Sequence, residues 1–311
     1  AEQRKTVNHL YSLSKLGIDD ACFPKASPDN DLSKIDKKAF EEDYSTLWKD
    51  FISEFKTIPT DNETVFIETL LAILKKYTWC IPASTNDLSN VSLFEHLKTT
   101  AAIASSMYSY HEENPGSFQW ELGITRPGFN SDHLPLMLVC WDISGIQKFI
   151  YNISSRKAAV SLKGRSFYLQ LLMDAVIQKT TKSCGINSGH VIYGSGGKLF
   201  LLMSNTKHNN EKLKKIHQEI EDDLWDKHQG GLYLCLGITP FLYNTADKKV
   251  VLEDGNKYEM SALWKNAAES AARNKGKKYY QKLSTAFESF FTPNGEVIEG
   301  SDFDICAVTG I

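Results

Sequence analysis

The sequence has no long apolar run, no paired cysteines and no excess of positive charge. No stretch of about 18 apolar residues occurs, so we expect no membrane-spanning helix. The six cysteines form no CxxC pair, which favours reduced thiols in a cytoplasmic protein over a disulfide framework. The residues from Ala1 to Lys5 do not open an apolar signal peptide. A net charge of -3 gives no general signal for nucleic acid, so such binding would need a local basic patch.

The composition is that of a globular chain: 311 residues, 42% hydrophobic and 23% charged, with material for about two domains. Residues 1–112 show helical spacing. We expect one helix to begin with a capping box from Thr60 to Glu63 and another with a capping box from Ser92 to Glu95. The apolar faces expected on these helices are Phe66, Leu70, Ile73, Leu74 and Tyr77, and then Leu93, Leu97, Ala101, Ala104 and Tyr108. Residues 113–135 are rich in turn-forming residues and are predicted to be a linker.

Residues 136–243 change to a mixed pattern of strands and helices. An apolar run at 136–141 predicts a buried strand, and Gly194 to Gly197 predict a tight turn between two further strands. Helical spacing separates these strands, and alternation at 232–238 predicts a last, half-buried strand. The β-α-β-β-α-β order predicts a ferredoxin-like domain in an α+β fold, with four antiparallel strands and two helices on one face. Residues 244–311 are predicted to form a helical segment.

The predicted domain has only one acidic residue at the positions where polymerase-like palms and nucleotide cyclases carry several. In such folds two metal ions bridge carboxylates and nucleotide phosphates, and acids follow the first strand and lie on the central hairpin. Here Asp142 follows the first strand, but the hairpin from Gly194 to Leu199 carries no acid. One carboxylate cannot hold two metal ions, so we predict no catalysis by this domain alone. The glycine amides and Lys198 could cradle a phosphate, or the glycines could simply form the turn.

Five segments carry a resemblance to a known family. The segment 142–151, DISGIQKFIY, resembles the first-palm signature of the large, polymerase-like subunit of type III CRISPR interference complexes, in the Csm-type (III-A) branch. Segments 161–166, SLKGRS, and 196–202, GGKLFLL, are similar to the following helix and hairpin of that palm. Segments 76–82 and 93–102 are similar to later helices of the family's HD domain. The segments occur in the family's order, so the resemblance rests on their combination.

The resemblance implies a longer protein with an HD nuclease domain, two palms, a zinc-bearing insert and a C-terminal helical domain. The intact family cleaves single-stranded DNA. It also makes cyclic oligoadenylate from ATP with Mg or Mn when target RNA is bound. The implied partners are the other subunits of the complex, guide RNA and target RNA. The residues expected to line the non-catalytic half of the ATP site are Asp142, Ser144, Gly145, Gln147, Gly196, Gly197 and Lys198.

Departures from the family pattern limit what this chain is expected to do. It contains no His-Asp dipeptide and no Gly-Gly-Asp-Asp, so we assign no catalytic and no metal-binding residue. Residues 1–112 are expected to be a remnant of the HD domain, and the chain an N-terminal and first-palm fragment. Cys306 resembles the start of the zinc segment, but Thr309 stands where a second cysteine would complete CxxC.

Two alternatives of other classes stay open at this point. A stand-alone nucleotide cyclase would need acids on the hairpin, which are absent. An RNA-binding module of the same topology would need exposed aromatic residues on central strands, with Tyr193 and Phe200 as candidates. Lysines between 265 and 282, Lys275 among them, are expected on a solvated helix face or against RNA or a protein partner. Arg165 is expected to meet a phosphate or to pair with Asp174 or another acid.

Overall fold

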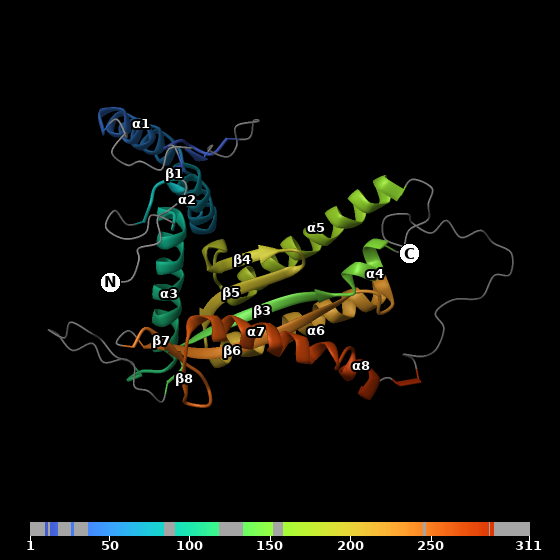
Figure 1. Cartoon of the computed structure of the whole chain (residues 1–311). Coiled ribbons are helices and arrows are strands. Elements are labelled where there is room, and N and C mark those ends of the chain that lie inside the picture. The colour runs from blue at the N-terminus through green and yellow to red at the C-terminus, as the bar shows by residue number, and fades with distance from the viewer. Residues whose placement is uncertain are drawn as a thin grey trace, which may run out of the picture. The chain divides into compact units, whose positions relative to one another are not determined.

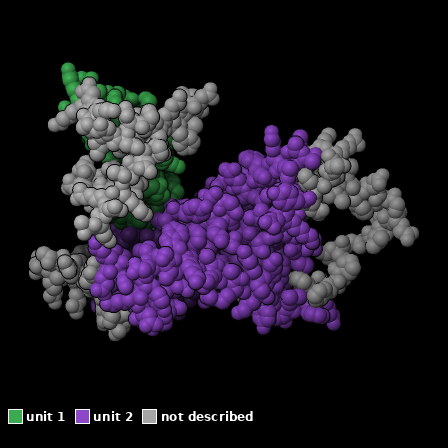
Figure 2. Space-filling view, in the orientation of Figure 1, with its two compact units in different colours: residues 1–102, 187–190 green, residues 103–186, 191–311 purple. Residues whose placement is uncertain are grey.

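The computed structural model divides the chain into two compact units. It describes residues 10–11, 13–17, 26–27, 37–83, 91–117, 133–151, 158–244, 247–285 and 287–288. One unit comprises residues 1–102 with 187–190, and the other comprises residues 103–186 with 191–311 (Figure 2). Most of the expected linker, at 118–132, and the expected start of a zinc segment at Cys306 lie outside the described residues. Within the described part of the chain, no helix is long and apolar enough to cross a membrane.

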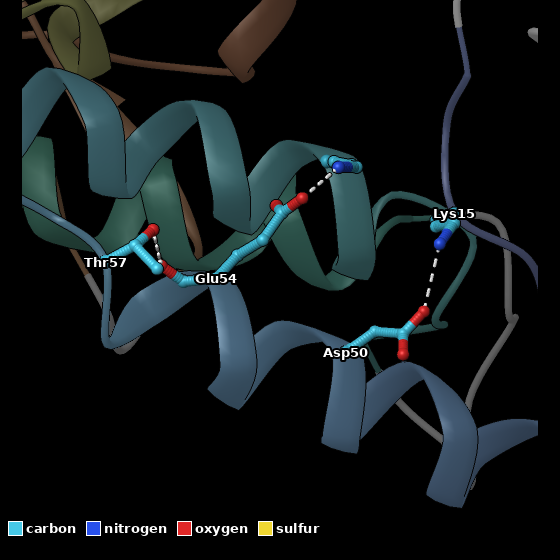
Figure 3. A network of polar contacts seen from close by, with 5 residues as sticks. Lys15, Asp50, Glu54 and Thr57 are labelled. Carbon is cyan, nitrogen blue, oxygen red and sulfur yellow. Dashed lines mark hydrogen bonds and ion pairs between the residues drawn. The ribbon is translucent and has the colours of Figure 1, made fainter.

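The first unit is built from helices, as its spacing predicts. Its elements are β1 (Leu10–Tyr11), β2 (Ala26–Ser27), α1 (Lys37–Phe55), α2 (Glu63–Thr78), the first half of α3 (Leu93–Glu113), and the short 3-10 helix η2 (Ser188–His190) (Figure 1). One cluster of its buried apolar residues consists of Leu13, Leu47, Ile58, Ile73 and Tyr77. Polar contacts join the segment before α1 and the two helices: Lys15 Nζ lies 3.0 Å from Asp50 Oδ2, and Lys76 pairs with Glu54 (Figure 3). Thr57 donates to the Glu54 carbonyl at 2.7 Å, which closes the end of α1.

The two expected capping boxes have different outcomes. Before α2 the cap is Asn62, whose side chain accepts from the Val65 amide at 3.1 Å, so the expected role of Thr60 is wrong. The Asn side chain reaches the free amide from one residue before the helix, and Glu63 is already helical. Before α3 the Ser92 hydroxyl accepts from the Glu95 amide at 3.1 Å, which confirms the Ser92 half of the expected box. The Glu95 carboxylate pairs with Lys98 at 2.6 Å.

The buried face of α3 is not the one predicted from spacing. Leu97 and Tyr108 are exposed, whereas Phe94, Ala102 and Tyr110 are buried. The helix carries apolar residues around much of its circumference, so spacing alone did not select the face that packs.

The second unit contains one six-stranded antiparallel sheet with helices on both faces (Figure 1). Its elements are β3 (Leu136–Ser144), α4 (Ile146–Tyr151), α5 (Ala158–Cys184), β4 (Val191–Ser195), β5 (Lys198–Ser204), α6 (Lys207–His228), β6 (Tyr233–Asn244), β7 (Lys249–Val251), β8 (Lys257–Tyr258), α7 (Met260–Lys275) and α8 (Tyr280–Thr285). The strand order is β4-β5-β3-β6-β7-β8. The antiparallel pairing of the four expected strands is confirmed. Two further strands, β7 and β8, extend the sheet beyond β6, so the expectation that residues 244–311 form a helical segment is wrong at these two strands.

One face of this sheet forms the main apolar core with α5 and α6. Alternate residues of β3 point toward these helices: Met137, Val139, Trp141 and Ile143. The apolar face predicted for α6 is confirmed, since Leu213, Ile216, Ile220 and Leu224 are all buried in this core. The face predicted for α5 is partly wrong. Phe167 and Leu171 are exposed, and the helix packs instead through Leu169, Met173 and Val176.

The other face of the sheet is covered by α7. Gly237 of β6 allows this contact, because a Cβ there would lie 2.4 Å from both the Ala267 oxygen and the Ala271 nitrogen. On β5, Phe200 packs against Trp264 with ring centroids 4.7 Å apart. The last predicted strand therefore lies between two covered faces and is buried on both sides at Tyr233 to Leu236, not half-buried as alternation suggested.

Candidate functional site: the strand ends around Asp142

Asp142 lies near the end of β3, between its two neighbouring strands. Its register partner on β5 is Lys198, and its partner on β6 is Cys235. Because side chains alternate along a strand, Asp142 points away from the core residue Trp141 and toward α7. The residue is only 8% exposed, so its carboxylate needs partners within the protein.

The β4–β5 hairpin brings its glycine turn next to this carboxylate. Gly196 and Gly197 have φ of 61° and 80°, the left-handed backbone that a two-residue hairpin turn of this kind requires. The Gly197 carbonyl accepts from the Ile143 amide at 2.8 Å, which fixes the turn against the end of β3. The structure thus brings together Asp142, Gly196, Gly197 and Lys198, four of the residues that the sequence assigned to one site.

Two of the expected phosphate-approach glycines are required by packing within the protein. A Cβ on Gly197 would lie 2.3 Å from Ile146 Cδ1. Gly145 has a φ of 95°, and a Cβ there would lie 2.1 Å from the Gly231 carbonyl oxygen. Gly196 differs, since a Cβ built on it meets nothing within 4 Å. Of the three, only Gly196 faces open space that a ligand could enter.

Lys275, at the end of α7, is the residue that sequence reasoning missed. Its Nζ lies 2.8 Å from Asp142 Oδ2, closer than the Nζ of Lys198 at 3.7 Å. The hydrogen bond to Asp142 raises the pKa of Lys275, so the lysine stays charged. The sequence offered no signal for this contact, because Lys275 belongs to a run of lysines expected on a solvated helix face. Packing of α7 on the sheet creates it.

The pairing leaves the cluster with a local positive charge. Two lysines face one carboxylate, and the side chains of Lys198 and Lys275 are 38% and 41% exposed. Such a group suits a phosphate better than a metal ion, because the one acid is already neutralised. Among the described residues, no three His, Cys, Asp or Glu side chains gather as metal ligands.

The remaining predicted residues and the nearby thiols add little reactivity. Ser144 is half-buried at the end of β3, and Gln147 is exposed on the short helix α4. Burial raises the pKa of Cys140 to about 11 and that of Cys235 to about 12, so both thiols near Asp142 are neutral. Neutral thiols are weak nucleophiles, and the cluster offers no nucleophile of this kind.

Arg165 and Phe200 do not take their expected roles. Arg165 is buried and donates to the Phe149 carbonyl, so it meets neither a phosphate nor Asp174. Its guanidinium also lies over the Phe149 ring, 5.2 Å from the centroid. Phe200 is 6% exposed beneath Trp264, so it offers no surface for stacking RNA bases. Tyr193, the other candidate, is 50% exposed, but it lies on the edge strand β4 and not on a central strand.

Comparison with known proteins establishes the family. The family model "Csm1 subunit domain B" matches residues 135–293, and the chain therefore belongs to the Csm1 family, as the motif resemblance predicted. The chain is 29% identical, over 94% of its length, to a protein of Methanocaldococcus jannaschii named "CRISPR system single-strand-specific deoxyribonuclease Cas10/Csm1 (subtype III-A)". It is 30% identical, over 62% of its length, to the protein of that name from Mycobacterium tuberculosis. The chain spans 38% and 24% of the lengths of these two relatives.

Solved structures show the same fold. A Csm1-Csm4 cassette in complex with cA3 matches 88% of this chain and 34% of its own with a TM-score of 0.66, at 22% identity. A Csm1-Csm4 cassette in complex with AMPPNP matches 92% of this chain and 35% of its own with a TM-score of 0.65, also at 22% identity. The mixed helix and antiparallel-sheet architecture is therefore that of Csm1 structures.

Proposed function

We propose that this chain supplies the non-catalytic half of an ATP site in the large subunit of a type III-A CRISPR effector, which acts in cytoplasmic antiviral defence. The observation that carries the proposal is the cluster of Lys198 and Lys275 around Asp142, beside the open turn at Gly196. The triphosphate would meet the two lysines and the turn. Ser144, Gly145, Gln147 and Gly197 would border it. AMPPNP and ATP in structures of Csm1-Csm4 cassettes support a nucleotide as the ligand.

The domain organisation behind this proposal has four parts. Residues 1–112 are a helical remnant of an HD domain, 113–135 a linker, 136–243 a ferredoxin-like first palm, and 244–311 a segment leading to a zinc insert. The order β4-β5-β3-β6, with α5 and α6 as the two crossover helices, supports the palm assignment. The helical first unit supports the first part.

In the intact subunit, a second palm would bring the acids that hold Mg or Mn, and the HD domain would cleave single-stranded DNA. Synthesis of cyclic oligoadenylate would respond to target RNA paired with guide RNA in the assembled complex. The Csm1-Csm4 structures support partnership with other Csm subunits. This chain alone would catalyse neither reaction, because Asp142 is held between lysines and the hairpin carries no acid.

The test uses the intact subunit in its complex. Lys198→Ala and Lys275→Ala should each weaken ATP binding about tenfold, because each removes a charged phosphate contact. Cyclic oligoadenylate production at subsaturating ATP should fall in parallel. Lys265→Ala is the matched control, since Lys265 lies on the same helix as Lys275 and pairs with Glu269 at 3.8 Å.

Unchanged ATP binding in both folded lysine variants would show that the nucleotide-site assignment is wrong. Lysine variants test the site more cleanly than Gly197→Glu. Any side chain at Gly197 would strain a backbone with a φ of 80° and displace Ile146, and so would disturb the hairpin whether or not a nucleotide binds there.

A further inference from the structure

A second polar cleft lies along the edge of β6, away from the turn at Gly196. Strand β3 pairs with β6 from Tyr233 to Phe241, but β7 pairs only with Leu242 to Asn244 on the other side. Within the described chain, the outer edge of β6 before Leu242 therefore borders helices, with α6 and α7 on either side. The cleft there has a volume of about 390 Å³, within the range of small-molecule sites.

Side chains bond three carbonyls along this strand edge, one just before β6 and two within it. Tyr279 donates its hydroxyl to the Leu232 carbonyl at 2.7 Å, and the His217 ring bonds the Leu234 carbonyl at 2.8 Å. Asn274 donates its amide to the Leu236 carbonyl at 2.5 Å. At these three positions, a molecule that enters the cleft meets side chains rather than the strand's own acceptors.

Two lysines of the cleft stand out from their neighbours. Lys215 pairs with Glu219 at 3.9 Å, and Lys282 pairs with Asp222 at 2.9 Å. In the part of the chain that the structure describes, no ion pair involves Lys214 or Lys277, both of which line the cleft. Two uncompensated ammonium groups, one from α6 and one from the turn that follows α7, favour an anionic ligand.

The floor of the cleft contains a buried acid with spare hydrogen-bonding capacity. Glu221 lines the cleft and is 4% exposed, and among the described residues its Oε1 has no hydrogen-bond partner. Burial raises the pKa of Glu221, and the nearby Asp222 acts in the same sense, so a proton costs less on this acid than on an exposed one. A protonated carboxyl presents a donor beside an acceptor.

The spacing of these groups suits a ligand with an anionic group at one end and a hydrogen-bonding ring at the other. Glu221 lies two turns after Lys214 on α6, or about 10 Å along the helix axis. Tyr280, which is 66% exposed, offers a ring face at the cleft. An adenine base matches the donor and acceptor of a protonated carboxyl through N1 and the 6-amino group, and it stacks on aromatic rings. A phosphate matches the lysines.

We propose that the β6-edge cleft, lined by Lys214, Glu221, Lys277 and Tyr280, binds an adenosine monophosphate group. The phosphate lies against Lys214 and Lys277, and the base lies against Glu221 and Tyr280. The site is separate from the cluster around Asp142 and does not depend on that cluster binding ATP.

The test measures AMP and GMP binding by calorimetry to the purified protein carrying Lys198→Ala, so that the Asp142 cluster contributes little. We expect one saturable site that prefers AMP. Lys214→Ala should weaken AMP binding about tenfold, whereas Lys215→Ala, one residue away, should leave it unchanged. Glu221→Gln keeps a donor beside an acceptor and should retain the AMP preference, whereas Glu221→Met should abolish it.

Four results would overturn the proposal. One is the absence of saturable AMP binding at millimolar concentration, and another is equal weakening by Lys214→Ala and Lys215→Ala. Inorganic phosphate that binds as tightly as AMP would show that no base is recognised. An AMP preference that survives Glu221→Met in a folded protein would remove the acid from the site. Failure of the ATP proposal would leave all of these measurements unaffected.

Discussion

The two faces of strand β3 differ in composition: one contributes to the apolar core, and the other carries the charged residues of the candidate site. Trp141 points into a core of aliphatic side chains from α5 and α6 and is fully buried. Its neighbour Asp142 points to the other face, where α7 delivers Lys275. The Trp141 face makes apolar contacts throughout, and the Asp142 face carries a small group of charged side chains that are partly exposed to solvent. A single helix that covers one face of a sheet can therefore place a charged group at the end of a buried strand, while the apolar core on the opposite face stays closely packed.

The largest effect on stability should come from a substitution in the apolar core on the Trp141 face of β3. Trp141→Ala should lower the free energy of unfolding by about 3–5 kcal/mol, because it empties a large volume in a close-packed core. Its ring also lies 6.0 Å from that of His217, so α6 loses a contact. Urea denaturation followed by circular dichroism would measure the change. Leu171→Ala, at an exposed position on α5, is the control and should change stability by less than about 0.5 kcal/mol.

A smaller effect should come from lifting α7 off the opposite face. Gly237→Ala places a methyl group against backbone atoms of Ala267 and Ala271, and should cost about 1–3 kcal/mol. Gly194→Ala is the matched control in another strand, because its nearest contact would be an ordinary 3.6 Å. The same denaturation experiment applies. Equal stability of the two variants would mean that α7 does not pack closely on β6.

The charged group itself should contribute less than either packing change. A double-mutant cycle with Asp142→Asn and Lys275→Met should give a coupling energy of about 0.5–1 kcal/mol, limited by the exposure of the lysine to solvent. The equivalent cycle with Lys198→Met should give a smaller value, because Lys198 lies 3.7 Å from the carboxylate instead of 2.8 Å. A larger coupling for Lys198 would reverse the assignment of the main partner.

The smallest effect concerns pH, and it belongs to the apolar face. Burial lowers the pKa of His217, so the unfolded chain binds its proton at a higher pH than the folded chain. Stability is therefore full above the unfolded pKa of about 6.5 and falls as the pH drops below it. His217→Gln should make this fall shallower between pH 7 and 5, because the substituted side chain does not bind the proton. His228 acts in the same sense, so some slope should remain.

The control for the pH experiment lies on the same helix. His208 is exposed in the first turn of α6, and His208→Gln should leave the slope of stability against pH unchanged. An equal change in slope for His208→Gln and His217→Gln would contradict the role of burial.

The local sequence pattern was sufficient to predict structure where an element packs against a single neighbour. The apolar stripe of α6 follows from its sequence, because this helix packs on the sheet along a single face. The glycine turn at Gly196 and Gly197 also follows locally, since few residues adopt two successive positive φ values. Both features were predicted, and the turn placed the hairpin beside Asp142.

The sequence pattern was insufficient to predict contacts between elements that lie far apart in the sequence. The helix around Trp264 was expected, but nothing in its sequence showed that it covers the second face of the sheet. Lys275 therefore stayed in a surface run of lysines, and β6 was expected to be half-buried. On α5, apolar residues on both sides left spacing unable to choose between the Phe167 side and the Leu169 side. Only tertiary packing decides between such alternatives.

The side chains that hold the outward carbonyls of β6 have a consequence for behaviour in solution. An exposed strand edge invites hydrogen-bonded pairing with a strand of another molecule and so promotes aggregation. Tyr279, His217 and Asn274 occupy three successive outward acceptors of this edge. An extended segment of another chain would have to displace all three before the sheet could grow by adding a strand there. These three side chains thus act as a barrier to self-association at this edge of the sheet.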